Sequence, residues 1–320
     1  KVRGAYALAA IWSQAPDAIV AAKKDSPLVI GLGELENYIA SDVPALLKHT
    51  RRVVYLEDGE SALLRGDRCV FFDAAGRDIE KTPSHIDWDS TAAEKTGYRH
   101  FMLKEIHEQP RAVDNTLRGR LYPLNDGVLQ RETGLTPDLL KATKHIHILA
   151  CGTSWHAGIV GKYLLERHAG LSTQIETASE FRYRKPVLSA DTLVIAISQS
   201  GETADTLAAM QLAQQAGLKV LSIGNTLGAA IPRRADFNFH TCCGPECGVA
   251  STKAFVGQLT ALSLLALHAA LARGFIPEAE ANEWAAQLQG LPELMRKTLK
   301  LDAQIQAVAE TLYTADRFLY

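Results

Sequence analysis

The sequence has no excess of charge of either sign and no run of basic residues. Lys and Arg number 34 and Asp and Glu number 36 among 320 residues, which gives a net charge of −2. This balance gives no reason to propose a nucleic-acid or membrane partner. The five cysteines are too few for a disulfide framework in a chain of this length, so we expect a cytoplasmic protein.

Motifs for common cofactors and catalytic triads are also missing. The sequence contains no Walker loop, no G-x-G-x-x-G fingerprint and no interpretable Ser-His-Asp or Cys-His arrangement, so neither ATP nor NAD is indicated. Cys242, Cys243 and Cys247 lack the spacing of a C-x-x-C pair, and no second ligand cluster accompanies them. We therefore expect ordinary thiols there, with no metal and no cofactor.

No hydrophobic run has the uniformly apolar character of a membrane span. The most apolar stretch, residues 254–272, contains polar side chains that a lipid-facing segment would avoid: Gln258, Thr260, Ser263 and His268. This pattern favours a helix in the protein core.

The first part of the chain is rich in strand and turn signals. Residues 1–88 alternate short apolar runs with turn residues, which predicts an antiparallel α+β region. The expected strands are 4–12, 18–22, 28–31, 37–42, 52–56 and 69–72, with a turn at 23–27 and a helix near 43–48. Residues 89–136 are polar and mixed. They predict a connector whose helices, at 101–109 and 110–118, are separated at Pro110.

Further along, strands alternate with helices. Between residues 137 and 275 we expect strands at 145–150, 174–176, 193–197, 220–223 and 237–241, and helices at 155–168, 202–217 and 251–274. This alternation predicts an α/β domain with a five-stranded parallel sheet in a three-layer αβα sandwich. For residues 276–320 we expect a helical connector and a strand at 317–320. Strand patterns near both termini suggest a piece of a longer protein.

One stretch carries most of the chemistry. After the buried strand at 193–197 come three hydroxyls, an amide and a glycine in the order Ser198-Gln199-Ser200-Gly201-Glu202-Thr203. The glycine lets backbone approach a ligand, and the helix start that follows offers unpaired N–H groups to an anion. A second turn with hydroxyls, at 151–154, follows the strand at 145–150. Either turn alone could merely cap a helix. At the carboxyl edge of one parallel sheet, the two together predict a shared site for a small phosphate ester.

Other polar residues have simpler explanations beside functional ones. Backbone at Val249 could reach a sugar hydroxyl, although Ser251 or Thr252 could simply cap the long apolar helix. We interpret Glu246 as a solvated loop acid rather than as a contact to the sugar. We interpret Asp205 as an acid in the first turn of a helix rather than as a catalytic base. Three histidines are interpreted as structural: His145, His147 and His156.

Four motifs together resemble a known family. They lie at residues 151–154, 178–184, 198–206 and 248–255. They are similar to the first sugar-isomerase (SIS) domain of the glutamine–fructose-6-phosphate aminotransferases. Residues 98–110 resemble the interdomain segment of that family. Residues 26–33 and 39–42 resemble the back half of its N-terminal-nucleophile glutaminase domain. The resemblance divides the chain into a glutaminase remnant (1–88), a linker (89–136), a first SIS domain (137–275) and a connector with the first strand of a second SIS domain (276–320).

The resemblance also implies an activity and a set of binding residues. The family transfers ammonia from glutamine to fructose 6-phosphate and makes glucosamine 6-phosphate, as a homodimer in the full-length enzyme. The residues implied to bind the sugar phosphate are Thr153, Ser154, Ser198, Gln199, Ser200 and Thr203. Val249 and Ser251 are implied to hold the sugar.

Departures from the family pattern limit what this chain is expected to do alone. The cysteine nucleophile of the glutaminase and the glutamate, histidine and lysine of the isomerase have no counterpart in these residues. A Lys-Lys-Asp turn at 23–25 replaces an arginine-containing one. We therefore expect weak binding at best and neither half-reaction from the chain by itself, and we assign no catalytic residue in it.

Two alternative functions were weighed against this interpretation. The first is a non-catalytic sugar-phosphate sensor with a SIS domain; such regulators carry a helix-turn-helix, and the strand-rich residues 1–88 argue against one. The second is another SIS enzyme, such as a sugar-phosphate isomerase or deglycase, which the glutaminase-like residues disfavour.

Overall fold

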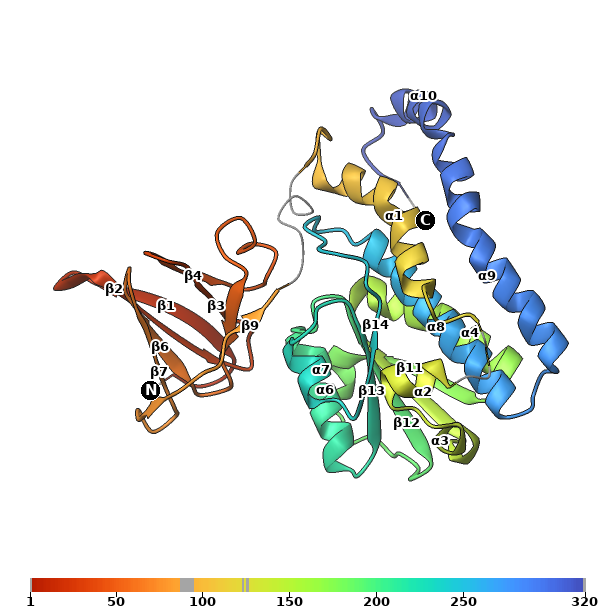
Figure 1. The fold of residues 1–320 in the computed structure, drawn as a ribbon, viewed down its shortest axis with the longest axis horizontal. Helices are drawn as coiled ribbons and strands as arrows, with labels where there is room; N and C mark the ends of the chain where they lie inside the picture. Colours follow the sequence, from red (N-terminus) through yellow and green to blue (C-terminus); the bar gives the residue numbers. More distant parts are fainter. Residues whose placement is uncertain (1, 87–94, 123, 125–126, 319–320) are drawn as a thin grey trace.

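The computed structural model describes residues 2–86, 95–122, 124 and 127–318. Two antiparallel sheets lie beside a larger α/β unit (Figure 1). In order across the first sheet, the strands are β1 (Tyr6–Trp12), β2 (Ala15–Lys24), β6 (Ser61–Leu64), β7 (Cys69–Phe72) and β8 (Asp78–Ile79). Across the second they are β4 (Asn37–Ala40), β3 (Val29–Leu32), β5 (Arg52–Tyr55) and β9 (Ser84–His85).

The antiparallel sheets pack face to face. Ala21 and Leu64 of the first sheet share a buried cluster with Ile30 and Val54 of the second. The expected turn at 23–27 is wrong at its start, because β2 continues through Lys24. Lys23 is buried in this strand, where its charge is paired with Asp58 at 3.0 Å.

The helix expected near 43–48 is also wrong. Residues 42–49 form a series of bends and turns, with backbone hydrogen bonds from Leu46 to Val43 and from His49 to Leu46 that span three residues. Val43, Leu46 and Leu47 are buried beside the second sheet. Burial of these side chains explains why the stretch looked like an amphipathic helix in the sequence.

One continuous helix, α1 (Phe101–Leu117), replaces the two helices expected on either side of Pro110. A proline inside a helix removes one backbone hydrogen bond and costs about 3 kcal/mol or more. Val113 and Leu117 pack into the main core of the α/β unit, and this burial offsets the cost. Two short helices follow, α2 (Val128–Thr133) and α3 (Pro137–Ala142).

The predicted five-stranded parallel sheet is confirmed. In order across the sheet, its strands are β11 (Ser172–Thr177), β10 (His145–Ala150), β12 (Thr192–Ser198), β13 (Lys219–Gly224) and β14 (Phe237–His240). All neighbouring pairs are parallel. The register pairs Ala150 with Ile197, so β10 and β12 end at the same level of the carboxyl edge.

Helices cover both faces of this sheet, which confirms the three-layer arrangement. On one face, Ile148 and Ile195 pack with helices α4 (Gly152–Ala169) and α8 (Lys253–Ala272). On the other face, Val194 and Ala196 pack with α5 (Ala178–Phe181), α6 (Ala204–Gln215) and α7 (Ala230–Arg234). Helix α8 is long and apolar enough to cross a membrane, but 72% of its most apolar stretch is buried inside the molecule. The prediction of a core helix is therefore confirmed.

The C-terminal residues form two helices. Helix α9 (Glu278–Leu299) runs beside α1 and α8, and α10 (Asp302–Leu312) lies beyond it with no buried residue (Figure 1). The strand expected at 317–320 is not formed by Arg317 and Phe318. Residues 319–320 lie outside the described residues.

Candidate functional site

The strand order places two loops at a point where a parallel sheet opens a crevice. From β10 the chain passes to β11 on one side, and it later returns to β12 on the other side. Loops that leave neighbouring strands in opposite directions diverge at such a switch point, and ligands of open α/β sheets bind there. The loops after β10 and β12 are the two hydroxyl-rich segments singled out in the sequence.

The segment after β10 belongs to a helix rather than to a free turn. Helix α4 begins at Gly152, earlier than the predicted start at 155, so Thr153 and Ser154 occupy its first turn. Thr153 is exposed, whereas Ser154 is buried. The Ser154 hydroxyl oxygen accepts a hydrogen bond from Nε2 of Gln258 in α8, at 3.0 Å.

The segment after β12 is held by its own hydroxyls. Ser198 Oγ accepts a hydrogen bond from the N–H of Gly201 at 3.1 Å and lies 2.9 Å from Thr203 Oγ1. Ser200 Oγ accepts one from the N–H of Glu202 at 3.2 Å. Helix α6 starts at Ala204 with Thr203 at its N-cap position, so the predicted helix start at 202 is wrong.

Helix α7, which the sequence analysis missed, packs against this loop. The Gly201 carbonyl accepts a hydrogen bond from the N–H of Ile231 at 2.9 Å. The Glu202 carboxylate accepts one from the N–H of Ala230 at 2.7 Å. Gly201 has a φ of +70°, and a Cβ there would lie 2.6 Å from the Cβ of Ala229. Close packing and a left-handed backbone therefore both require glycine at this position.

Glu202 is the acidic residue of the 198–203 loop, and its surroundings raise its pKa. Burial raises the pKa of Glu202, although the N–H of Ala230 and nearby Lys23 and Arg233 oppose the rise. Because burial disfavours the ionised form, protonation here is easier than at an exposed glutamate.

Helix α7 also joins the loop to the N-terminal sheets. Arg233 and Arg234 bind the two carboxylate oxygens of Glu57 at 2.7 and 2.8 Å. The hydroxyl of Tyr55 donates to the carbonyl of Leu227 at 3.3 Å. The first part of the chain is thereby attached beside the 198–203 loop through one short helix.

Glu246 was expected to be a solvated loop acid, and this expectation is wrong. The side chain is buried, and one carboxylate oxygen accepts the N–H groups of Thr252 and Ala254 at 2.9 and 3.2 Å. The other oxygen accepts the Ser251 hydroxyl at 2.8 Å. Glu246 therefore caps α8, a role that the sequence analysis had considered for Ser251 or Thr252, and Thr252 makes no capping bond with its side chain.

Val249 and Ser251 differ in what they can offer to a ligand. Val249 is fully exposed, and its backbone can be approached from solvent. The Ser251 proton already binds Glu246, which leaves the hydroxyl oxygen as an acceptor.

The histidines and Asp205 have structural partners. His147 is buried beside Glu176, with Nε2 and Oε2 separated by 3.4 Å, and burial lowers the pKa of His147. His156 is exposed, with its ring nitrogen 3.0 Å from the Gly152 carbonyl. Asp205 lies in the first turn of α6 and binds Arg182 at 2.7 Å, as a helix acid would.

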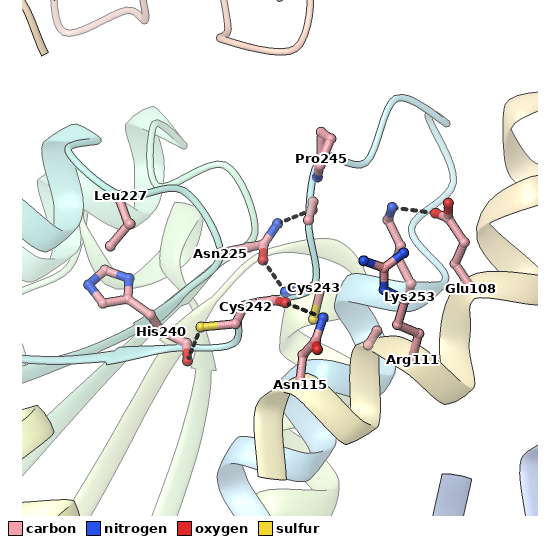
Figure 2. A pocket seen from close by; sticks show the side chains of 12 residues that line it. Glu108, Arg111, Asn115, Asn225, Leu227, His240, Cys242, Cys243, Pro245 and Lys253 are labelled. Atoms are coloured by element: carbon pink, nitrogen blue, oxygen red, sulfur yellow. Dashed lines mark hydrogen bonds and ion pairs between the residues drawn. The ribbon is translucent and has the colours of Figure 1, made fainter. Parts of the chain in front are cut away.

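A cavity of about 270 Å³ lies next to the switch point. Figure 2 shows its walls, which include Glu108 of α1 paired with Lys253 of α8 at 2.6 Å. Across the cavity, Asn225 binds the N–H of Cys243 and the carbonyl of Gly244. The backbone N–H of Asn225 donates to the carbonyl of Gln199 at 3.3 Å. The cavity therefore adjoins the 198–203 loop but is lined by none of the predicted phosphate residues.

All five cysteines are free thiols. Within residues 2–86, 95–122, 124 and 127–318, no group of three His, Cys, Asp or Glu side chains is close enough to hold a metal ion. Cys243 is buried, and this burial raises its pKa to about 11.

Residues 139–268 match the family model described as the SIS domain. The match covers the five-stranded sheet and both hydroxyl-rich segments. The chain therefore carries a SIS domain, with the fold expected from its motifs.

Longer similarities extend over the whole chain. The chain is 44% identical to the glutamine–fructose-6-phosphate aminotransferase [isomerizing] of Caldanaerobacter subterraneus subsp. tengcongensis, with 100% of this chain and 52% of that protein aligned. The protein of the same name from Symbiobacterium thermophilum is 46% identical over 98% of this chain and 51% of its own length. The chain spans about half the length of the curated relatives it matches.

A solved structure agrees with these relatives. The C-terminal domain of glucosamine-fructose-6-phosphate aminotransferase from Francisella tularensis has a TM-score of 0.64 and 39% identity. The superposition covers 68% of this chain and 61% of that one. The resemblance stated from the motifs is confirmed, and the alternative of a non-catalytic sensor is not favoured.

Proposed function

We propose that this chain forms part of a glutamine–fructose-6-phosphate aminotransferase and binds the phosphate of fructose 6-phosphate or glucosamine 6-phosphate. The phosphate lies at the switch point between β10 and β12 in this proposal. The residues that hold it are Thr153, Ser154, Ser198, Gln199, Ser200 and Thr203, and Val249 and Ser251 contact the sugar.

The observation that carries the proposal is the direction of the hydroxyl protons. Ser154 and Ser200 each already accept an N–H, so each has its own O–H proton to donate. Ser198 accepts the N–H of Gly201 and shares one hydrogen bond with Thr203. Whichever hydroxyl donates in that pair, the other keeps a proton for a ligand. Three O–H donors at one sheet edge suit an acceptor-only group such as a phosphate.

Helix geometry supports the same ligand. Thr153 lies in the first turn of α4, and Thr203 directly precedes the first turn of α6. Helix N-termini carry unpaired N–H groups and a partial positive charge, which favour anions. Binding therefore needs no lysine or arginine in contact with the phosphate, and a neutral site suits an ester that must be exchanged for product.

The remaining functions belong to the proposed longer enzyme. Ammonia from glutamine reaches the sugar bound here, the enzyme acts as a homodimer in the cytoplasm, and no cofactor takes part. We assign no catalytic residue within this chain.

A titration monitored by ³¹P NMR tests the phosphate site in the 320-residue chain. Fructose 6-phosphate should bind and fructose should not. Ser200→Ala should weaken binding roughly tenfold or more, because a hydrogen bond to a charged group is lost. Ser263→Ala is the matched control, since the Ser263 hydroxyl bonds only the carbonyl of Leu259 in its own helix. Equal affinity of the wild type and Ser200→Ala would refute the assignment.

A further inference from the structure

We propose that Gln258 is a positioning residue of the phosphate site, which orients the Ser154 hydroxyl so that its proton is directed to the anion. This inference rests on the proposed function, because it needs an anion beside Ser154. It gives a task to a buried amide that neither the sequence motifs nor the fold accounts for.

Close packing of two helices brings this amide to the site. Ser154 and Gly161 are both buried in α4, two turns apart. A Cβ at Gly161 would lie 2.8 Å from the Leu262 side chain of α8. The missing side chain of Gly161 therefore lets α8 approach α4 closely enough for Gln258 to reach Ser154.

Gln258 behaves differently from the two hydroxyl side chains that follow it on α8. Thr260 and Ser263 each return their hydroxyl proton to a carbonyl four residues earlier in the same helix. Gln258 is only 2% exposed, and its Nε2 crosses to Ser154 at 3.0 Å. Its other polar atom, Oε1, is buried without a hydrogen-bond partner in the described part of the chain.

The unpaired Oε1 reduces what this amide contributes to stability. A buried polar group with an unpaired acceptor costs free energy. The residues that share this stretch of α8 and are fully buried, such as Ala261 and Leu262, show that an apolar side chain is suited to the surroundings. A glutamine at this position therefore points to a role in binding, where activity and stability often oppose each other.

The direction of the hydrogen bond decides what the glutamine does. Nε2 can only donate, so the Ser154 oxygen accepts and its proton remains for a ligand. An acceptor in the same place would take that proton and turn it away from the phosphate. The glutamine thus selects one of two hydroxyl orientations before the ligand arrives, which lowers the entropy cost of binding.

The first test combines affinity with stability. Gln258→Leu should weaken fructose 6-phosphate binding severalfold, measured by ³¹P NMR, while its urea midpoint stays equal to the wild type or rises. In a Ser154→Ala background, Gln258→Leu should cause no further loss, since the amide acts through that hydroxyl. Thr260→Val is the matched control and should leave binding unchanged. A purely structural glutamine predicts a lower midpoint and additive losses, and that result would overturn the proposal.

The second test uses the proton of a carboxyl. Gln258→Glu places an acceptor beside Ser154 when ionised and a donor when protonated. The ratio of variant to wild-type affinity should rise as the pH falls from 8 to 5, and taking the ratio cancels the titration of the phosphate itself. A flat ratio contradicts the inference. If the wild type binds no fructose 6-phosphate, the proposed function is wrong. If Ser154→Ala weakens binding but both Gln258 variants bind like the wild type, only the role of Gln258 is wrong.

Discussion

Replacing Gly201 with alanine tests whether close packing against α7 holds the 198–203 loop in place. The residue has a φ of +70°, and the new Cβ would lie 2.6 Å from the Cβ of Ala229 and 3.2 Å from the Cδ of Pro232. Both neighbours belong to the segment that starts α7. Gly217→Ala is the matched control, because Gly217 has a φ of +81° but no atom within 4 Å of the added Cβ.

The two substitutions share one cost and differ in another. A left-handed alanine costs about 1–2 kcal/mol at either position. Overpacking adds about 1–3 kcal/mol, and only at Gly201. We therefore expect a loss of about 1–2 kcal/mol for Gly217→Ala and about 2–5 kcal/mol for Gly201→Ala.

Urea unfolding and phosphate binding measure the two consequences. Gly201→Ala should also lose affinity for fructose 6-phosphate, because moving α7 displaces the N–H that Gly201 supplies to Ser198. Gly217→Ala should bind like the wild type. Equal unfolding free energies for the two variants, or unchanged binding in Gly201→Ala, would refute the reasoning.

Three further predictions concern the groups around the site. Glu246→Ala should lower the unfolding free energy by about 1–3 kcal/mol in urea denaturation, because three donors at the start of α8 lose their buried acceptor. The control is Glu283→Ala, which removes an exposed glutamate on α9. An equally small loss for both variants would contradict the capping role of Glu246. Burial pushes the pKa of Glu57 up, but Arg234 and Arg233 lower it overall. Above pH 4.5 the ionised carboxylate therefore stabilises the contact with α7 by about 1 kcal/mol or less, and this stabilisation is lost as the pH falls through the lowered pKa. Hydrogen exchange of the α7 amides should show this pH dependence in the wild type and not in Glu57→Gln. Iodoacetamide at pH 8 should label the exposed Cys242 long before Cys243, whose pKa burial raises to about 11, and mass spectrometry showing equal rates would contradict that burial.

The sheet and the hydroxyl-bearing segments at its carboxyl edge could be predicted because their signals are local. β12 has an apolar run that ends at Ser198, and Thr153 and Ser154 follow shortly after the end of β10. Parallel strands place such ends on one edge, so the phosphate hypothesis needed no knowledge of the remaining chain. The ends of helices and strands were predicted less accurately. The sequence pattern predicted that α4 starts at residue 155, whereas in the structure it starts at Gly152.

Features that depend on distant residues could not be predicted. Gln258 bonds a residue 104 positions away, and Glu246 caps α8 from outside the helix. The sequence predicted a helix break at Pro110, because proline lacks the N–H that a helix interior needs. Packing of α1 on α8 keeps the helix continuous through this residue. The helix predicted near 43–48 is wrong for the opposite reason, since buried apolar side chains at helical spacing do not by themselves require a helix.

A crystal structure of the chain with fructose 6-phosphate tests the central claim most directly. The account predicts the phosphate between the carboxyl ends of β10 and β12, with its oxygens within 3.2 Å, the usual hydrogen-bond range, of the hydroxyls of Ser154, Ser200 and Thr203. Phosphate density in the cavity beside Asn225 and Lys253, with the hydroxyls of the switch point making no contact to it, would contradict the account.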